Sequence, residues 1–170
     1  MKRTALLWNL LLLTCLLPAV SHAEDRDIYH YSGLPIPRFA SFNSEETNVR
    51  VGPGTRYPIR WVYKRKDWPV EIIGEFGHWR NIRDHEGAEG WVHKGLLSGK
   101  RTAFLRGSTR PLRLAPDSNS AQIVNISANV SSILKECTPQ WCHVAVNKYE
   151  GWLPREHLWG IYENEEIKAK

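Results

Sequence analysis

The segment that decides the fold reads Asn48-Val49-Arg50-Val51-Gly52-Pro53-Gly54-Thr55-Arg56-Tyr57. Its Val-Arg-Val alternation is typical of a half-buried strand. The following Gly-Pro-Gly ends the strand in a turn, because proline restricts φ and glycine adopts backbone angles that other residues avoid. A weaker copy, Leu112-Arg113-Leu114-Ala115-Pro116-Asp117, follows later in the chain. The two copies predict that the protein is built from two repeats.

The repeats align over most of their length, with offsets of 60 to 63 residues. The matched pairs are Val49 with Leu112, Val70 with Val130, Trp79 with Trp141, Ile82 with Val144, Gly90 with Gly151 and Leu97 with Leu158. Tryptophans that recur at the same place in both copies, at 79 and 141 and at 91 and 152, are expected to be core or half-core residues. The short joint at 98–101 predicts that the two units touch.

Short segments rich in valine, isoleucine and tryptophan predict an all-β fold with little helix. The strands expected in and just before repeat one are 39–42, 46–51, 61–64, 68–76, 79–83 and 88–93, with a single helical turn or bend at 94–97. We predict a first domain at 38–99 and a second at 100–162, preceded by an extended leader at 24–37 and followed by a polar tail at 163–170.

The first 23 residues have the pattern of a cleaved signal peptide, with Lys2 and Arg3 before an apolar run and small residues at 21 and 23. A lipoprotein signal at Cys15 is the weaker alternative. Cleavage predicts a periplasmic or secreted protein with no transmembrane segment, because the apolar run is shorter than the ~20 residues of a spanning helix. The mature chain then carries 21 basic and 18 acidic residues, a mildly basic balance that does not indicate a nucleic-acid polycation.

Signal removal leaves Cys137 and Cys142 as the two mature thiols. An even pair in an exported protein predicts a disulfide, here across a hairpin turned by Pro139. Two free thiols are the alternative. The Cys-Thr-Pro-Gln-Trp-Cys spacing lacks the two-residue gap of thiol oxidoreductases, and no further ligands at suitable spacing support a zinc site.

Three motifs of repeat one, Asn48 to Pro53, Gly77-His78-Trp79 and Gly90-Trp91-Val92, together resemble the bacterial SH3 (SH3b) family. Repeat two keeps Gly151-Trp152-Leu153 but has Pro111 and Ala115 where the family has asparagine and glycine. The tandem looks most like a small exported SH3-like protein group of alpha-class Gram-negative bacteria. The resemblance implies two tandem SH3-like small β-barrels. It also implies a module that binds cell-wall peptides or proteins, although fold alone does not settle function.

Aromatic and basic side chains that occur only in repeat one predict a peptide-binding surface beside its turn. The candidate ligand-binding residues are Tyr57, Trp61, Tyr63, Arg65 and Trp68, and Arg56, Arg60, Lys64 and Lys66 add positive charge. Arginine can bind the carboxylates of peptidoglycan peptides or of an acidic envelope protein bidentately. Ordinary strand packing and a charged edge that discourages aggregation are the alternatives.

No pattern indicates catalysis, a metal or another cofactor. His93 and His157 each stand alone near the end of a repeat, and no Gly-x-Ser-x-Gly elbow is present. We therefore expect a non-enzymatic protein that binds peptidoglycan peptides or an envelope protein and does not bind nucleic acid. An adaptor without wall affinity is the alternative, and a small wall hydrolase is a third and weaker hypothesis.

Overall fold

The computed structural model describes residues 31–168. The predicted signal peptide with Cys15, the leader residues 24–30 and the last two residues of the tail lie outside the described residues. The fourteen strands are β1 (Arg38–Phe42), β2 (Thr47–Arg50), β3 (Ile59–Tyr63), β4 (Pro69–Phe76), β5 (Trp79–Arg83), β6 (Glu89–His93), β7 (Leu97–Ser98), β8 (Thr102–Leu105), β9 (Arg110–Arg113), β10 (Gln122–Ile126), β11 (Ser131–Cys137), β12 (Trp141–Val146), β13 (Tyr149–Pro154) and β14 (Leu158–Trp159).

Two single-turn 3-10 helices, η1 (Lys94–Leu96) and η2 (Arg155–His157), complete the described secondary structure. The helical turn predicted at 94–97 is confirmed as η1. Neither helix of the described chain is long or apolar enough to cross a membrane. Because strands and these two helical turns make up the described secondary structure, the fold is all-β with little helix, as predicted.

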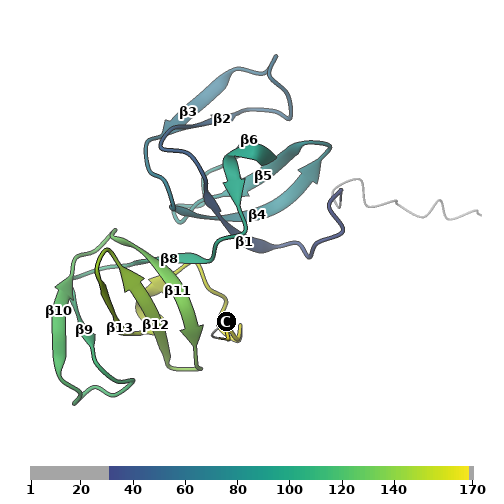
Figure 1. The fold of residues 1–170 in the computed structure, drawn as a ribbon. Coiled ribbons are helices and arrows are strands. Elements are labelled where there is room, and N and C mark those ends of the chain that lie inside the picture. Colours follow the sequence, from purple (N-terminus) through teal and green to yellow (C-terminus); the bar gives the residue numbers. More distant parts are fainter. Residues whose placement is uncertain (1–30, 169–170) are drawn as a thin grey trace, which may run out of the picture.

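The strands form two seven-stranded antiparallel sheets with the same order of strands. The first runs β3-β2-β6-β5-β4-β1-β7 and the second β10-β9-β13-β12-β11-β8-β14, which is the first order shifted by seven strands. Figure 1 shows each sheet curled into a small unit, blue to teal for the first and green to yellow for the second. The duplication predicted from the sequence is confirmed.

Strand pairing fixes which residues correspond between the two units. Trp91 lies opposite Asn81 and Trp152 opposite His143, so the predicted correspondence of Trp79 with Trp141 and of Gly90 with Gly151 holds. The match of Val70 with Val130 is wrong. Val70 pairs with Ala40, whereas its counterpart, the residue opposite Ala103, is Ser132. The loop before β11, residues 127–130, is one residue shorter than the loop before β4, residues 64–68, whereas the valine match requires a loop shorter by three.

The two matched glycines let β6 and β13 approach β2 and β9 closely. A Cβ on Gly90 would lie 2.4 Å from Val49 Cγ1, and one on Gly151 would lie 2.6 Å from the carbonyl oxygen of Arg113. Any larger residue would separate these strands. The tryptophan that follows each glycine then packs half-buried on the outside of the sheet.

An aromatic stack joins the two units. Trp68, 5% exposed, lies parallel to Phe104 of β8 with ring centroids 4.4 Å apart and an interplanar angle of 7°. Phe104 is 1% exposed and packs in the core of the first unit although it belongs to the second sheet. Arg65 donates a hydrogen bond to the carbonyl of Asn129 across the same joint. The predicted contact between the units is confirmed, and it is a packed interface.

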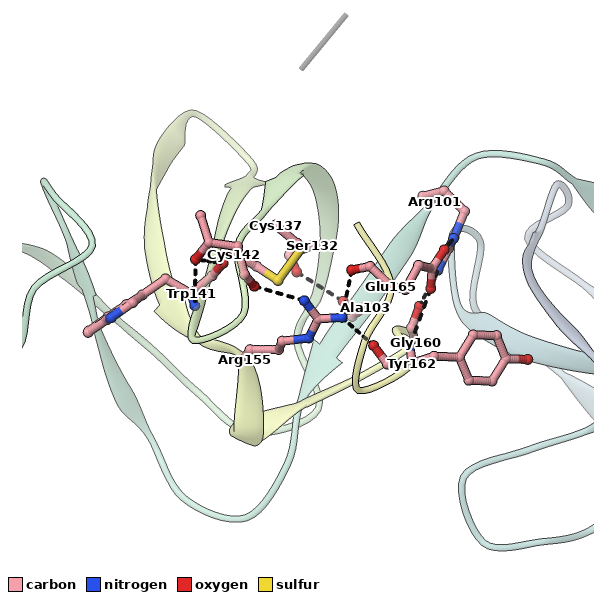
Figure 2. Close-up of a disulfide and its surroundings, with 11 residues drawn as sticks. Arg101, Ala103, Ser132, Cys137, Trp141, Cys142, Arg155, Gly160, Tyr162 and Glu165 are labelled. Atoms are coloured by element: carbon pink, nitrogen blue, oxygen red, sulfur yellow. Dashed lines mark hydrogen bonds and ion pairs between the residues drawn. A yellow bond between two sulfur atoms is a disulfide. The ribbon is translucent and has the colours of Figure 1, made fainter. Parts of the chain in front are cut away.

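The C-terminal segment also crosses the joint. Tyr162 packs on Phe39 of β1 and donates to the Glu71 carboxylate at 2.9 Å. Burial, and then the bond to Glu71, raise the pKa of the Tyr162 phenol. The Glu165 carboxylate pairs with Arg101 of the linker, as Figure 2 shows. Tyr162, the last residue of the predicted second domain, therefore ties the second unit to the first, and Glu165 of the predicted polar tail is held by the linker.

The predicted disulfide between Cys137 and Cys142 is present, and it closes the β11–β12 hairpin. Both cysteines are buried. Strand pairing places Glu75 and Arg80 at the corresponding positions of the first unit, where they form a buried ion pair with Nε and Oε1 3.0 Å apart. The same pair of positions on neighbouring strands is thus linked by an ion pair in the first domain and by a disulfide in the second.

Replacing both cysteines with alanine should lower the free energy of unfolding by about 2 kcal/mol, because the cross-link restricts the unfolded chain over a short loop. Urea unfolding of the double variant, compared with the parent, measures this change. Alkylation of the native protein without reductant should label neither thiol. Stoichiometric labelling, or an unchanged urea midpoint, would contradict the proposed contribution.

Candidate functional site

The predicted ligand-binding residues do not form one cluster in the structure. Tyr57 and Trp61 lie on the β2–β3 hairpin and define, with Arg56 and Arg60, what we call the hairpin surface. The other three predicted residues take part in packing and in the joint between domains. Of the five predicted residues, the structure therefore brings Tyr57 and Trp61 together on one hairpin.

The ring of Tyr57 is held in place by the turn that ends β2. A Cβ on Gly52 would lie 2.5 Å from Tyr57 Cδ1, so the ring can rest on the turn only because a glycine is there. Arg50 donates to the carbonyls of Thr55 and Tyr57, at 3.1 and 2.7 Å, and closes the loop from inside. The Gly-Pro-Gly segment thereby presents a fixed aromatic ring at the hairpin tip.

Two arginines lie over aromatic rings on the hairpin surface. The guanidinium carbon of Arg56 is 5.2 Å from the Tyr57 ring centroid, and that of Arg60 is 5.1 Å from the Trp61 ring centroid. Neither forms an ion pair with a carboxylate among residues 31–168. Ile59, 46% exposed, lies on the same edge strand. Positive charge without a counterion beside apolar surface suits an acidic, partly apolar ligand.

Tyr63 is a packing residue. Its ring packs on Phe42 with centroids 4.9 Å apart, and its hydroxyl donates to Asp84. Burial, and then this bond, raise the pKa of Tyr63. Asp84 also accepts from the backbone of residues 86 and 88, both at 2.9 Å, and so holds the β5–β6 turn. The Tyr63 hydroxyl is therefore committed within the domain.

Trp68 is buried at the joint between the domains, which corrects its prediction as a ligand contact, whereas Arg65 at the same joint is exposed and stays a predicted contact. Trp68 is buried against Phe104, and the Arg65 guanidinium carbon lies 4.6 Å from the Trp68 ring centroid. Trp68 directly precedes β4 and faces the second domain, so its burial depends on residues far away in the sequence. A ligand cannot reach this ring while the domains are packed together.

Sequence reasoning missed a groove in the second domain. It has a volume of about 590 Å³ and lies between β9, the β11–β12 turn and η2. Trp141 and three prolines, Pro111, Pro139 and Pro154, contribute to its walls. The three prolines around a matched tryptophan, absent from repeat one, are the signal that could have identified it.

Among residues 31–168, no three histidine, cysteine or acidic side chains come together as metal ligands would. His93 accepts a hydrogen bond from the Gly95 backbone at 3.2 Å and begins η1, and the His157 imidazole lies 3.4 Å from the Glu156 carboxylate. Both histidines thus have local partners at the start or end of a helical turn.

Comparison with known proteins gives a consistent family match. The model described as "Bacterial SH3 domain" matches residues 43–99 and again 107–160. No curated protein matches the chain. Among solved structures, NlpC2 from Trichomonas vaginalis is 12% identical, covering 76% of this chain and 50% of that one with a TM-score of 0.34. A NlpC/P60 family protein from Bacillus cereus is 11% identical, covering 77% and 57% with a TM-score of 0.33. The chain thus spans about half the length of these two proteins.

Proposed function

This chain belongs to the bacterial SH3 domain family, and on that premise we propose that it is a non-catalytic binding protein of the cell envelope. Domains of this family are typically modules that bind the cell wall or other proteins. The ligand class that we propose is the carboxylate-bearing peptides of peptidoglycan, with an acidic segment of an envelope protein as the second possibility. The hairpin surface of the first domain is the proposed contact.

One observation carries this proposal: two guanidinium groups lie on aromatic rings at an exposed edge and have no carboxylate partner among the described residues. Arg60 donates from Nη1 to the Glu89 carbonyl at 3.2 Å, and the remaining N–H groups of the two guanidiniums have no carboxylate partner in residues 31–168. An arginine in this state can bind a ligand carboxylate. In the second domain, the corresponding segment 119–129 contains no lysine or arginine. The charge is therefore a property of the first domain and not a requirement of the fold.

An extracytoplasmic location is part of the same proposal. The Cys137–Cys142 disulfide suits an oxidising compartment, since intracellular thiols are kept reduced. The predicted signal peptide at 1–23 also indicates an extracytoplasmic location. Fractionation of cells that express the full chain would test it, and recovery of a shortened product in the periplasm is the expected result.

Replacing both Arg56 and Arg60 with serine should weaken binding to purified peptidoglycan sacculi about ten-fold or more. Hydrogen bonds to charged groups contribute about 1.5–3 kcal/mol each, and about 1.4 kcal/mol corresponds to a factor of ten. Cosedimentation at several protein concentrations measures the affinity. Binding of the parent protein should also weaken as salt is raised, because exposed charges are screened.

Lys148→Ser is the matched control, because Lys148 lies 5.4 Å from the Tyr149 ring centroid as an exposed cation–aromatic pair of the second domain. It should leave sacculus binding unchanged. If the parent protein does not bind sacculi at all, the wall proposal fails and an adaptor without wall affinity becomes the better account. Release of soluble muropeptides by the pure protein would instead indicate a hydrolase.

A further inference from the structure

The groove of the second domain has walls that are rigid before any ligand arrives. The Trp141 backbone N–H donates to Thr138 Oγ1 at 3.1 Å, and the disulfide joins the residues directly before and after this turn. From the other side, Arg155 donates to the Thr138 carbonyl at 2.8 Å, and its backbone N–H donates to the Gln140 carbonyl at 2.9 Å. Figure 2 shows Trp141 and Arg155 near the disulfide. Such a site loses little conformational entropy on binding.

The shape and lining of the groove suit an extended peptide. Its volume of about 590 Å³ falls within the range of small-ligand sites, which is about 300–1,000 Å³. The half-exposed Trp141 ring and the rings of Pro111, Pro139 and Pro154 form the apolar part of the lining. Flat and cyclic side chains of this kind pack well against a proline ring or another stiff apolar residue.

An arginine without a partner supplies the polar part of the groove. Arg110 makes no ion pair with residues 31–168, and its Nε is shielded from solvent with no hydrogen-bond acceptor in the described chain. Arg110 is half-buried and lines the groove, so the carboxylate of a ligand in the groove would supply the counter-charge that the described chain does not give it. The other arginine, Arg113, donates to the Ser120 carbonyl at 2.6 Å and holds the loop. The lining acid, Glu156, lies 3.4 Å from His157.

The first domain does not share these features. Strand register places Thr47 and Asn48 where the second domain has Arg110 and Pro111, and His93 where it has Pro154. Among the tryptophan, the three prolines and Arg110, only the tryptophan is common to both copies, as Trp79 and Trp141. The three prolines and the arginine are therefore particular to the second domain, and the fold does not require them.

We infer that this groove is a second ligand site, separate from the hairpin surface, and that it binds an extended segment of another protein. The segment would place a proline or similar apolar residue against Trp141 and an adjacent glutamate or aspartate against Arg110. The protein would then have two ligand sites on domains held together by a packed joint.

Titration of the isotopically labelled full chain with a blocked pentapeptide tests this inference. The peptide has the order alanine, proline, glutamate, proline, alanine, and a second peptide has glutamine in place of glutamate. The glutamate peptide should shift the indole N–H resonance of Trp141 in a saturable manner and bind about ten-fold more tightly than the glutamine peptide. Arg110→Gln should remove that difference, whereas the charge control Lys148→Gln should preserve it.

Equal affinity for the two peptides, or no saturable shift at millimolar peptide, would overturn the inference. So would shifts confined to residues outside the groove. If a soluble disaccharide-peptide fragment of peptidoglycan shifts Trp141 more strongly than the glutamate peptide, the groove is a wall site and the assignment to a protein segment is wrong. The comparison of the two peptides on the unaltered protein remains decisive even if Arg110→Gln fails to fold. None of these outcomes depends on Arg56 or Arg60, so the proposed function is judged separately.

Discussion

Trp68→Ala should lower the free energy of unfolding by about 3–5 kcal/mol, the usual cost of truncating a buried tryptophan. The ring is 5% exposed and stacks on Phe104 across the joint, so its loss leaves a cavity shared by both domains. We also expect the two domains to unfold in separate steps, because the stack is a main apolar contact between them. Scanning calorimetry of the full chain measures both effects.

Trp61→Ala is the matched control for this prediction. Trp61 is also a tryptophan of the first domain, but it is half-buried on the hairpin and its aromatic contact is with Tyr63 of the same strand. It should cost less stability and leave the two domains unfolding together. A loss below about 1 kcal/mol for Trp68→Ala, the range of ordinary surface substitutions, would show that the joint is not a stabilising interface.

Glu75→Gln should destabilise the protein by about 3 kcal/mol, since removing one partner of a buried ion pair leaves the other charge uncompensated. The Glu75 side chain is fully buried, and its carboxylate accepts hydrogen bonds from Ser32 and Arg38 in addition to pairing with Arg80. The substitution keeps the size of the side chain, so the charge is the main change. Urea unfolding at pH 7 measures the loss.

The same residue makes the stability of the parent protein depend on pH. Burial raises the pKa of the Glu75 carboxyl, but the hydrogen bonds from Ser32 and Arg38 and the charge of Arg80 outweigh it, and the pKa lies below its ordinary 4.5. The folded state then binds fewer protons than the unfolded state, so this stabilisation is complete above pH 4.5 and is lost as pH falls towards the lowered pKa. Glu75→Gln should flatten this part of the curve, and a curve of unchanged steepness would contradict the assignment. Glu165, whose pKa is also lowered, retains its own contribution in the variant.

The sequence predicted the arginines of the hairpin surface, but it could not show whether they lack a carboxylate partner and can bind a ligand. Local spacing shows that Arg56 and Arg60 stand beside Tyr57 and Trp61. Whether a carboxylate from a distant strand neutralises them depends on packing. The structure shows no such partner in the described chain, whereas it places the Glu71 carboxylate 2.8 Å from Nη2 of Arg83 on β5.

Patterns of short range determined most of the architecture. The turn at Gly52-Pro53-Gly54, the paired Gly90 and Gly151, and the two cysteines five positions apart depend on neighbours in the chain or in the next strand. Their geometry follows from steric limits that any copy of the repeat must obey. For this reason the duplication, the all-β fold and the disulfide could be predicted.

Only the tertiary structure decided which side chains remain available for binding. Trp68 and Tyr63 looked like ligand contacts because they are aromatic and near the turn, yet Phe104 and Asp84 engage them from distant parts of the chain. The groove around Trp141 likewise exists because prolines on three separate segments converge on it. The local sequence determines the strands, the turns and the disulfide. The burial of a side chain and the meeting of distant residues in a groove depend on long-range packing, which no pattern of neighbouring residues specifies.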